Sequence, residues 1–364
     1  MNILITAPSI NPSHNVSGIS TVAQNIIQYN KGQKYYHYLL GRSDKPTGRI
    51  RRLLNILEQI IVFPFFIKDN KIDVVHQNLP LDPKGVMREF LINSWCRIMN
   101  IPVLLHVHGG IFLMNGTKNV LFRFLIKSML RHSQRVIVLS ELEKEALLNN
   151  YRYSTAHVLY NSVDTAQYPQ RDKEVTKKKH NFLFLGRINE SKGIEDIIEA
   201  FKLIEKEMDF HFILCGDGPL KEKIIAECAA ILGKNFEYLG VVSGKEKIEV
   251  ICRSEYFLLP SRYGEGLPMA LLETMAAGVV PIVTDDASMK YVVRHAINGI
   301  RINKKDPIDL SEKIKYVIAH PDIYHALSMK ARNTIVEKFD IKDYIHKLNE
   351  IYNDIYLNRN IKPT

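Results

Sequence analysis

The chain is poor in cysteine and has no long run of apolar residues. Its 364 residues include four cysteines, with no C-x-x-C pair and no regular spacing: Cys96, Cys215, Cys228 and Cys252. This pattern argues against a disulfide framework, and we expect buried free thiols in a reducing compartment. The longest apolar run, residues 60–67, contains Pro64 and falls well short of the roughly 18 residues of a membrane-spanning helix. The opening residues MNILITAP read as a buried strand and predict no signal peptide.

The overall composition is that of an ordinary globular protein, with 46% hydrophobic and 24% charged residues. A length of 364 residues exceeds most single cores, so about two domains are expected. The net charge of +10 and the pI near 9.2 favour acidic partners. The candidates are anionic lipid, nucleic acid and phosphorylated small molecules.

Basic residues recur on two amphipathic segments in the first half of the chain. Residues 118–135 contain five basic residues and no acidic one, and four of them recur at every fourth position: Arg123, Lys127, Arg131 and Arg135. On a helix these four form a slowly spiralling stripe beside apolar residues, and residues 49–61 have the same character. We interpret both segments as contacts with an anionic membrane. The alternative is two helices that pack on a sheet and expose basic edges.

Apolar runs alternate with segments of helical length along the whole chain. The predicted strands of the first half are residues 3–7, 74–77, 103–107 and 136–139. After a linker at 164–179, those of the second half are residues 182–185, 210–215, 236–239, 256–259 and 280–284. Helices are predicted at residues 193–206, 220–232, 269–277 and 341–356. This order predicts an α/β fold with two Rossmann-like, doubly wound domains, each on a parallel sheet.

Residues 264–273, GEGLPMALLE, place two carboxylates around the start of a predicted helix. Gly266 and Pro268 suit a loop whose backbone approaches a ligand closely. Glu265 precedes the helix, where it can meet hydroxyl groups of a ligand. Glu273 lies about two turns into the helix, where it can accept hydrogen bonds from a vicinal diol such as that of ribose. The alternative is a surface loop followed by a solvated helix.

Ligands of doubly wound folds bind at the carboxyl ends of the strands, so the residues after each apolar run are candidates. Gly18 lies in a turn after the first strand, where backbone amides can meet a diphosphate. His106 and His108 share one strand face, but no third ligand follows at metal-site spacing. We therefore expect no metal ion and interpret His108 as a polar group that faces a cleft between the domains.

Two cations follow the first strand of the second half. Gly186 and Arg187 come directly after residues 182–185, and Lys192 lies just before a predicted helix. Arg187 can hold two phosphate oxygens and Lys192 acts as a point charge, so the pair predicts a diphosphate site. The next strand ends in the tight turn at residues 216–219, GDGP.

Two common nucleotide-binding patterns fail in this sequence. Lys221 stands where G-x-G-x-x-G requires its third glycine, so a dinucleotide fingerprint is absent. Residues 240–245 have the wrong spacing for a P-loop, and no serine or threonine follows the lysine.

Taken together, the motifs resemble family 4 of the glycosyltransferases over essentially the whole chain. The matching positions are Gly186-Arg187, Lys192-Gly193, Gly216-Asp217-Gly218-Pro219, Pro260-Ser261, Glu265-Gly266-x-Pro268 and Glu273. The resemblance implies the two-domain GT-B fold. It also implies transfer of a sugar from a nucleotide diphosphate sugar with retention of anomeric configuration, generally without a metal ion and without a cofactor.

The resemblance further implies roles for individual residues. Arg187 and Lys192 would hold the diphosphate and Glu273 the ribose. His108 would face the donor sugar near the anomeric carbon, and Glu265 would contact the donor sugar. The other implied donor-binding positions are Gly18, Gly186, Gly216, Gly266, Leu267 and Pro268.

The expected organisation is an acceptor-side domain at 1–165, a nucleotide-sugar-binding domain at 166–338 and a helix at 339–364 that returns to the first domain. We expect a hexosyltransferase that uses a UDP- or GDP-sugar and a lipid-linked glycan acceptor, in surface polysaccharide, lipopolysaccharide or glycolipid synthesis. It would bind peripherally to the inner face of the cytoplasmic membrane and would bind no nucleic acid. A soluble acceptor remains an alternative. So do a nucleotide-sugar epimerase or hydrolase on the same architecture and a non-enzymatic basic adaptor for membrane or nucleic acid.

Overall fold

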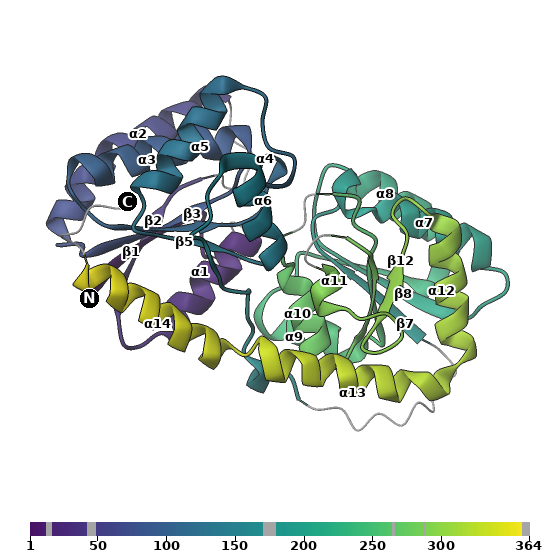
Figure 1. Ribbon diagram of the computed structural model, residues 1–364. Coiled ribbons are helices and arrows are strands. Elements are labelled where there is room, and N and C mark those ends of the chain that lie inside the picture. The colour runs from purple at the N-terminus through teal and green to yellow at the C-terminus, as the bar shows by residue number, and fades with distance from the viewer. Residues whose placement is uncertain (12–16, 42–48, 170–179, 264–265, 287–288, 359–364) are drawn as a thin grey trace. The chain divides into compact units, whose positions relative to one another are not determined.

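The computed structural model describes residues 1–11, 17–41, 49–169, 180–263, 266–286 and 289–358 (Figure 1). The chain divides into two compact units, which are Met1–Asn161 with Ile341–Thr364 (unit 1) and Ser162–Asp340 (unit 2). Each unit is built on one six-stranded sheet in which every strand pairing is parallel. The predicted α/β fold with two parallel sheets is confirmed.

Unit 1 has the strand order β2-β1-β3-β4-β5-β6. Its strands are β1 (Asn2–Ala7), β2 (Lys34–Leu39), β3 (Val74–Leu79), β4 (Val103–Val107), β5 (Arg135–Val138) and β6 (His157–Val158). Its helices are α1 (Gly18–Tyr29), α2 (Arg49–Asp69), α3 (Pro83–Ile98), α4 (Ile111–Met114), α5 (Val120–His132), α6 (Glu141–Tyr151) and α14 (Ile341–Leu357). Helices α1 and α14 pack together on one face, while α2, α3 and α5 pack side by side on the other (Figure 1).

Unit 2 has the strand order β12-β11-β10-β7-β8-β9. Its strands are β7 (His180–Leu185), β8 (Phe210–Cys215), β9 (Phe236–Gly240), β10 (Tyr256–Leu259), β11 (Val280–Thr284) and β12 (Ile300–Ile302). Its α-helices are α7 (Ile194–Ile204), α8 (Lys221–Leu232), α9 (Gly244–Arg253), α10 (Met269–Ala276), α11 (Met289–Val292), α12 (Pro307–Ala319) and α13 (Pro321–Lys338). The described residues of unit 2 also form the 3-10 turns η1 (Thr165–Gln167), η2 (Glu190–Lys192) and η3 (Gly233–Asn235). Helix α7 packs against α8 and α12, whereas α10 packs against α9 and α13.

The strands that lie inside each sheet are almost fully buried, which explains why they read as apolar runs. All five residues of β4 and all six of β3 are buried, as are the four of β10 and the five of β11. A strand covered by helices on both faces exposes neither side, so its sequence shows no alternation. The nine strands predicted from the sequence are present, as β1, β3, β4, β5 and β7 to β11.

The structure corrects the predicted basic stripe at one position. Helix α5 ends at His132, and Arg135 is the first residue of β5, where its guanidinium forms an ion pair with Asp354 of α14. Only Arg123, Lys127 and Arg131 therefore lie on the helix.

Buried histidines connect α14 to the sheet of unit 1. The hydroxyl of Tyr352 lies 2.6 Å from His76 Nδ1, and His76 Nε2 lies 3.1 Å from His106 Nδ1. Both imidazoles are fully buried, and burial lowers the pKa of His76 to about 3 and that of His106 well below its ordinary value. The helix that ends the described chain is thus held on unit 1 by neutral, hydrogen-bonded groups.

Acid is expected to destabilise unit 1 through these histidines. An unfolded histidine takes up a proton as the pH falls below about 6.5, whereas folded His76 does not until about pH 3, so stability is lost between these values. At pH 5 one such histidine lowers the free energy of unfolding by about 2 kcal/mol. Urea unfolding, followed by the fluorescence of Trp95 in α3 of unit 1, should therefore show a smaller loss of stability between pH 7 and 5 in His76→Phe. The exposed His346→Gln should keep the wild-type pH dependence, and an unchanged dependence in His76→Phe would contradict this assignment.

Candidate functional site

Three loops of unit 2 meet at the carboxyl edge of its sheet. They follow β7, β8 and β10 and comprise residues 186–193, 216–220 and 260–268, of which 264 and 265 lie outside the described residues. We call them the carboxyl-edge loops. In a parallel sheet the ends of neighbouring strands lie together, and β10, β7 and β8 are adjacent in the strand order.

Two glycines let these loops pack backbone against backbone. Gly216 has φ +138°, and a Cβ there would lie 1.8 Å from the carbonyl oxygen of Gly186. Gly193 has φ +67°, and a Cβ there would lie 1.9 Å from the carbonyl oxygen of Pro260. Side chains at these positions would overlap the neighbouring loop, so glycine fixes the shape of this edge.

The predicted phosphate ligands lie on the first of these loops. Arg187 is exposed directly after β7 and the glycine at 186, and Lys192 is the partly exposed last residue of η2. Helix α7 begins two residues after Lys192. The structure therefore places both cations within one short loop beside a helix N-terminus.

The helices that follow these loops begin without side-chain caps. Their N-cap residues are Gly193 for α7, Leu220 for α8 and Pro268 for α10, and none of these side chains can accept a hydrogen bond. By contrast, helices α3, α5 and α6 of unit 1 are capped by Asp82, Asn119 and Ser140. The N-cap side chains thus occupy no first-turn N–H group at the carboxyl-edge loops, although the N–H groups of Asp196 and Lys221 donate to the backbone carbonyls of Gly193 and Gly218. The helix dipole favours an anion at these ends.

Glu273 is buried in α10 and paired with a lysine that the sequence analysis did not select. Its Oε1 lies 2.7 Å from Nζ of Lys247 on α9, and the Glu273 residue is 6% exposed. The ion pair thus engages one carboxylate oxygen and leaves the second outside the pair.

Arg262 ties two of the loops together. Its Nε and a terminal nitrogen donate to both carboxylate oxygens of Asp196 on α7, at 3.0 and 2.6 Å, and its backbone N–H donates to the Ser191 carbonyl at 2.8 Å. The loop after β10 is thereby held against the loop that carries Lys192.

Not every predicted residue of the 264–273 motif can be placed. Glu265 lies outside the described residues. Gly266 and Pro268 are partly exposed, and Leu267 is 3% exposed, so its side chain packs inward. The predicted helix start at 269 is confirmed, since Pro268 is the N-cap and α10 begins at Met269.

In unit 1, His108 directly follows a strand, and Gly18 begins the first helix after β1. His108 follows β4, and its Nε2 lies 2.6 Å from Oδ1 of Asn78 at the end of β3. Burial lowers the pKa of His108 to about 3, so the imidazole is neutral at pH 7. Gly18 is the first residue of α1, and a Cβ built there would meet no atom of the described residues within 4 Å. The structure therefore gives no internal packing reason for glycine at position 18.

Two absences within the described part of the chain bear on the site. No three histidine, cysteine, aspartate or glutamate side chains are grouped there so that they could hold a metal ion. Neither does any helix among these residues combine the length and apolar character needed to cross a membrane.

Two family models match consecutive parts of the chain. The model for Glycosyltransferase Family 4 matches residues 17–167, and the model for Glycosyl transferases group 1 matches residues 168–334. The chain belongs to family 4 of the glycosyltransferases, and the family and enzyme class predicted from the sequence are confirmed.

Individual proteins agree with this assignment. The chain is 28% identical to an uncharacterized glycosyltransferase of Methanocaldococcus jannaschii, over 79% of this chain and 77% of that one. It is 24% identical to the UDP-Gal:alpha-D-GlcNAc-diphosphoundecaprenol alpha-1,3-galactosyltransferase of Escherichia coli, over 84% and 82% of the two chains. The crystal structure of Anabaena HepE with UDP-glucose superimposes with a TM-score of 0.77 at 15% identity, covering 97% of this chain and 100% of that one. This likeness confirms the GT-B fold.

Sequence reasoning missed Lys247, Arg262 and Asn78. Each acts through a residue from a different element, namely Glu273, Asp196 and His108 respectively. No local spacing in the sequence signals such pairs.

Removal of Lys247 alone is expected to destabilise unit 2 more than removal of the whole ion pair. Lys247→Met leaves a buried carboxylate without this cation, at a cost of about 2 kcal/mol, whereas Lys247→Met with Glu273→Leu should recover most of that loss. The measurement is urea unfolding followed by circular dichroism. The chain has one tryptophan, Trp95 in unit 1, so unfolding of unit 2 is the transition that changes the circular dichroism and leaves Trp95 fluorescence unchanged. Lys202→Met, which breaks an exposed pair with Glu199, is the control and should have no measurable effect. A double variant as unstable as the single one would contradict the expectation.

Proposed function

We propose that this chain is a retaining glycosyltransferase that moves a sugar from a UDP- or GDP-sugar to a hydroxyl of a lipid-linked glycan. The observation that carries the proposal is the joining of Arg187, Lys192 and three uncapped helix N-termini at one edge of unit 2. Backbone N–H groups, a guanidinium and an ammonium are the groups that bind a diphosphate.

The pairing of Glu273 with Lys247 supports a nucleotide in particular. A carboxylate held in place by one lysine keeps a second oxygen that can accept from a ribose diol. The named relatives point the same way, since HepE was solved with UDP-glucose and the Escherichia coli relative is named for a UDP-galactose donor. The proposed assignment is therefore diphosphate at Arg187 and Lys192, ribose at Glu273, and donor sugar at Glu265 and residues 266–268.

The chemistry follows from the charges that develop during transfer. Cleavage of the bond between sugar and diphosphate builds negative charge on the leaving oxygens and positive charge on the anomeric carbon. Arg187, Lys192 and the helix N-termini neutralise the leaving group without a metal ion. The acceptor hydroxyl attacks from the face that the diphosphate leaves, and the departing phosphate takes its proton. His108 of unit 1, with the backbone at Gly18, is assigned to the donor sugar and the diphosphate.

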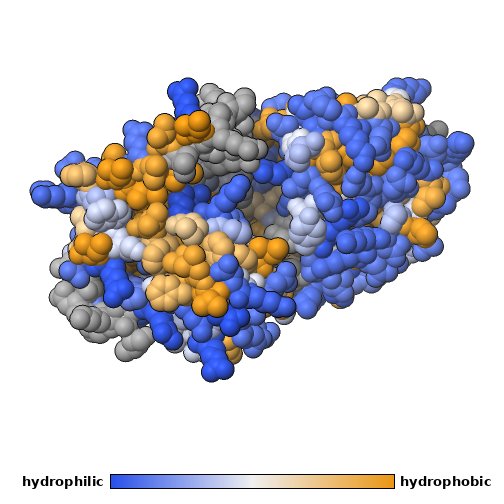
Figure 2. Space-filling view, turned by 90° about the horizontal axis from the view of Figure 1, so that it is seen from above, coloured by the Kyte–Doolittle hydropathy of each residue, from blue (hydrophilic) through white to orange (hydrophobic). Residues whose placement is uncertain are grey.

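A lipid-linked acceptor is supported by the surface of unit 1. Helix α2 exposes Ile50, Leu54, Leu57, Ile61 and Phe65, and the start of α5 exposes Val120, Leu121 and Phe124. Figure 2 shows hydrophobic side chains gathered on the face of unit 1 that carries α2 and α5. Arg51, Arg123 and Arg131 are exposed on the same two helices. Large apolar side chains beside cations favour an anionic membrane surface, which is where a lipid-linked acceptor is found. The Escherichia coli relative is named for such an acceptor.

The diphosphate site can be tested by calorimetric binding of UDP, GDP, ADP and NAD. Arg187→Ala with Lys192→Ala removes two charge-assisted contacts, so the affinity for the nucleoside diphosphate that binds should fall more than about a hundredfold, or at least ~3 kcal/mol. A matched control replaces Lys206 and Lys234, which are exposed residues of unit 2 just before β8 and β9, and should bind as the wild type does. Equal binding by the Arg187 and Lys192 variant would contradict the proposed site.

The same preparation separates the rival functions. A hydrolase or epimerase turns over the sugar nucleotide without an acceptor, whereas a transferase needs one. A basic adaptor would bind nucleic acid or membrane with strong salt dependence and would be unaffected by Glu273→Gln. Loss of nucleotide binding in Glu273→Gln, with no product until acceptor is added, is the outcome expected for the proposed function.

Membrane contact can be tested by flotation with vesicles of neutral lipid alone and with an added anionic lipid. Replacing Leu54, Ile61 and Phe124 by serine removes three large exposed apolar side chains from unit 1. Binding to anionic vesicles should fall at least about tenfold, because each such side chain contributes on the order of 1 kcal/mol when buried in the interface. Serine at Leu203 and Ile308, which are exposed in unit 2, is the control and should leave binding unchanged. Equal flotation of both variants would remove the support for a membrane-bound acceptor.

A further inference from the structure

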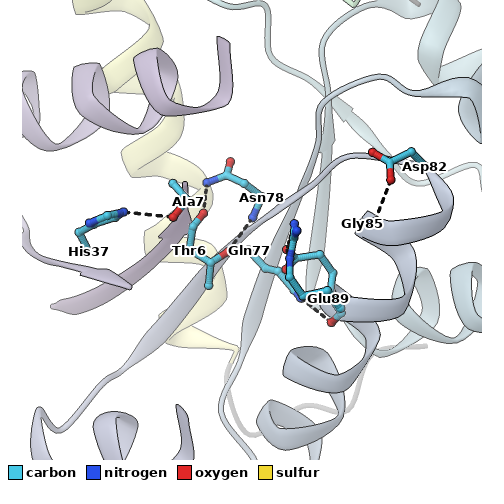
Figure 3. A network of polar contacts seen from close by, with 9 residues as sticks. Thr6, Ala7, His37, Gln77, Asn78, Asp82, Gly85 and Glu89 are labelled. Carbon is cyan, nitrogen blue, oxygen red and sulfur yellow. Dashed lines mark hydrogen bonds and ion pairs between the residues drawn. The ribbon is translucent and has the colours of Figure 1, made fainter. Parts of the chain in front are cut away.

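Asn78 is held in one orientation by the strand beside it. Its backbone N–H donates to Thr6 Oγ1 at 3.1 Å, and its side-chain Nδ2 donates to the Thr6 carbonyl oxygen at 2.7 Å (Figure 3). A carbonyl oxygen only accepts hydrogen bonds, so the side-chain nitrogen of Asn78 must be the atom that faces the Thr6 carbonyl oxygen. The amide oxygen of Asn78 is therefore the atom that faces away from Thr6.

That oxygen determines which nitrogen of His108 carries the proton. Asn78 Oδ1 lies 2.6 Å from His108 Nε2, and an amide oxygen can only accept, so Nε2–H must be the donor. Rotating the imidazole by half a turn would place a carbon against Oδ1 and lose the bond, so Asn78 fixes the ring orientation as well. The neighbouring ring of His106 lies with its centroid 4.0 Å from that of His108 at 37°, which packs one side of the imidazole.

The other nitrogen of the ring is then a bare acceptor. A neutral imidazole with Nε2 protonated has a lone pair on Nδ1, and the low pKa of His108 means that the ring is neutral at pH 7. Among the residues that the structure describes, no hydrogen-bond partner is found for this Nδ1. His108 itself is partly exposed at the carboxyl end of β4.

We propose that Asn78 is a positioning residue that fixes the tautomer of His108, so that Nδ1 accepts a hydrogen bond from a hydroxyl of the donor sugar. The inference rests on the proposed function, in which His108 faces the donor sugar. It defines the substrate class further: a neutral sugar can supply the hydroxyl proton, whereas a carboxylate at the same position has no proton to donate and would face a lone pair. The site therefore selects neutral-sugar nucleotides against uronate nucleotides.

The tautomer can be read directly by nitrogen NMR. In protein with ¹⁵N-labelled histidine, the resonances of His108 are identified by their loss in His108→Gln. The wild type should show a protonated Nε2 and an unprotonated Nδ1 at pH 7, and Asn78→Leu should show a mixture of the two tautomers. Asn93→Leu is the matched control, because Asn93 is also buried and hydrogen-bonded in unit 1 but contacts Gln77 and Ser133 instead of His108. A protonated Nδ1 in the wild type, or an unchanged spectrum in Asn78→Leu, would overturn the proposal.

Binding of UDP, UDP-glucose, UDP-galactose and UDP-glucuronate tests the consequence for the substrate. Wild-type protein should bind at least one neutral-sugar nucleotide about tenfold or more tightly than UDP-glucuronate. Asn78→Leu should lose most of this preference while its affinity for UDP alone is unchanged, and Asn93→Leu should keep it. Equal affinity of the wild type for UDP-glucuronate and both neutral sugars overturns the assignment of Nδ1 to a sugar hydroxyl while leaving the nucleotide site intact. Failure of all four compounds to bind is instead a failure of a uridine nucleotide site, and the NMR result still decides the role of Asn78.

Discussion

The proposed donor site depends on backbone contacts that only glycine permits. Gly216 brings the loop after β8 onto the carbonyl of Gly186, and Gly193 brings the loop after β7 onto the carbonyl of Pro260. These contacts hold three loops together at neighbouring strand ends, so that the two cations and three helix N-termini share one edge. The Arg262 pair with Asp196 adds side-chain bonds to the same assembly. Loops held in this way need little rearrangement to meet a diphosphate, which is how preorganised sites gain affinity.

Every strand of the described residues whose burial is complete was predicted from the sequence, as was the partly buried β9. Strands inside a parallel sheet read as unbroken apolar runs, and for this reason β3, β4, β10 and β11 were predicted. Strand β2 was missed because it lies at a sheet edge and its residues, KYYHYL, are only partly buried. Strands β6 and β12 were missed because they have two and three residues, too few to show a period. Helix α9 was not predicted because charged residues fill much of it, GKEKIEVICR.

Some residues of the candidate site can be predicted from short sequence motifs, whereas others contact the site from distant parts of the sequence. Gly186, Arg187, Lys192 and Glu273 lie in short motifs, so their spacing alone selects them. Lys247 reaches Glu273 from another helix, and Asn78 reaches His108 from another strand. Such pairs are determined by strand order and register, which place Asn78 opposite His106 in the β3–β4 pairing. A single sequence contains no local pattern that predicts this register.

A neutral histidine fits the proposed reaction better than a charged one. Transfer builds positive charge on the anomeric carbon, so an imidazolium beside the sugar would oppose the transition state, while a bare ring nitrogen would not. Burial in unit 1 keeps the imidazole neutral, because it lowers the pKa of His108 to about 3. Asn78 then accepts the one proton that the neutral ring carries, on Nε2. The cationic groups are instead concentrated on unit 2, at the carboxyl-edge loops, where the negative charge of the leaving group would form. In the proposed reaction, unit 2 therefore carries the cations that neutralise the leaving group, and unit 1 carries an imidazole that adds no charge.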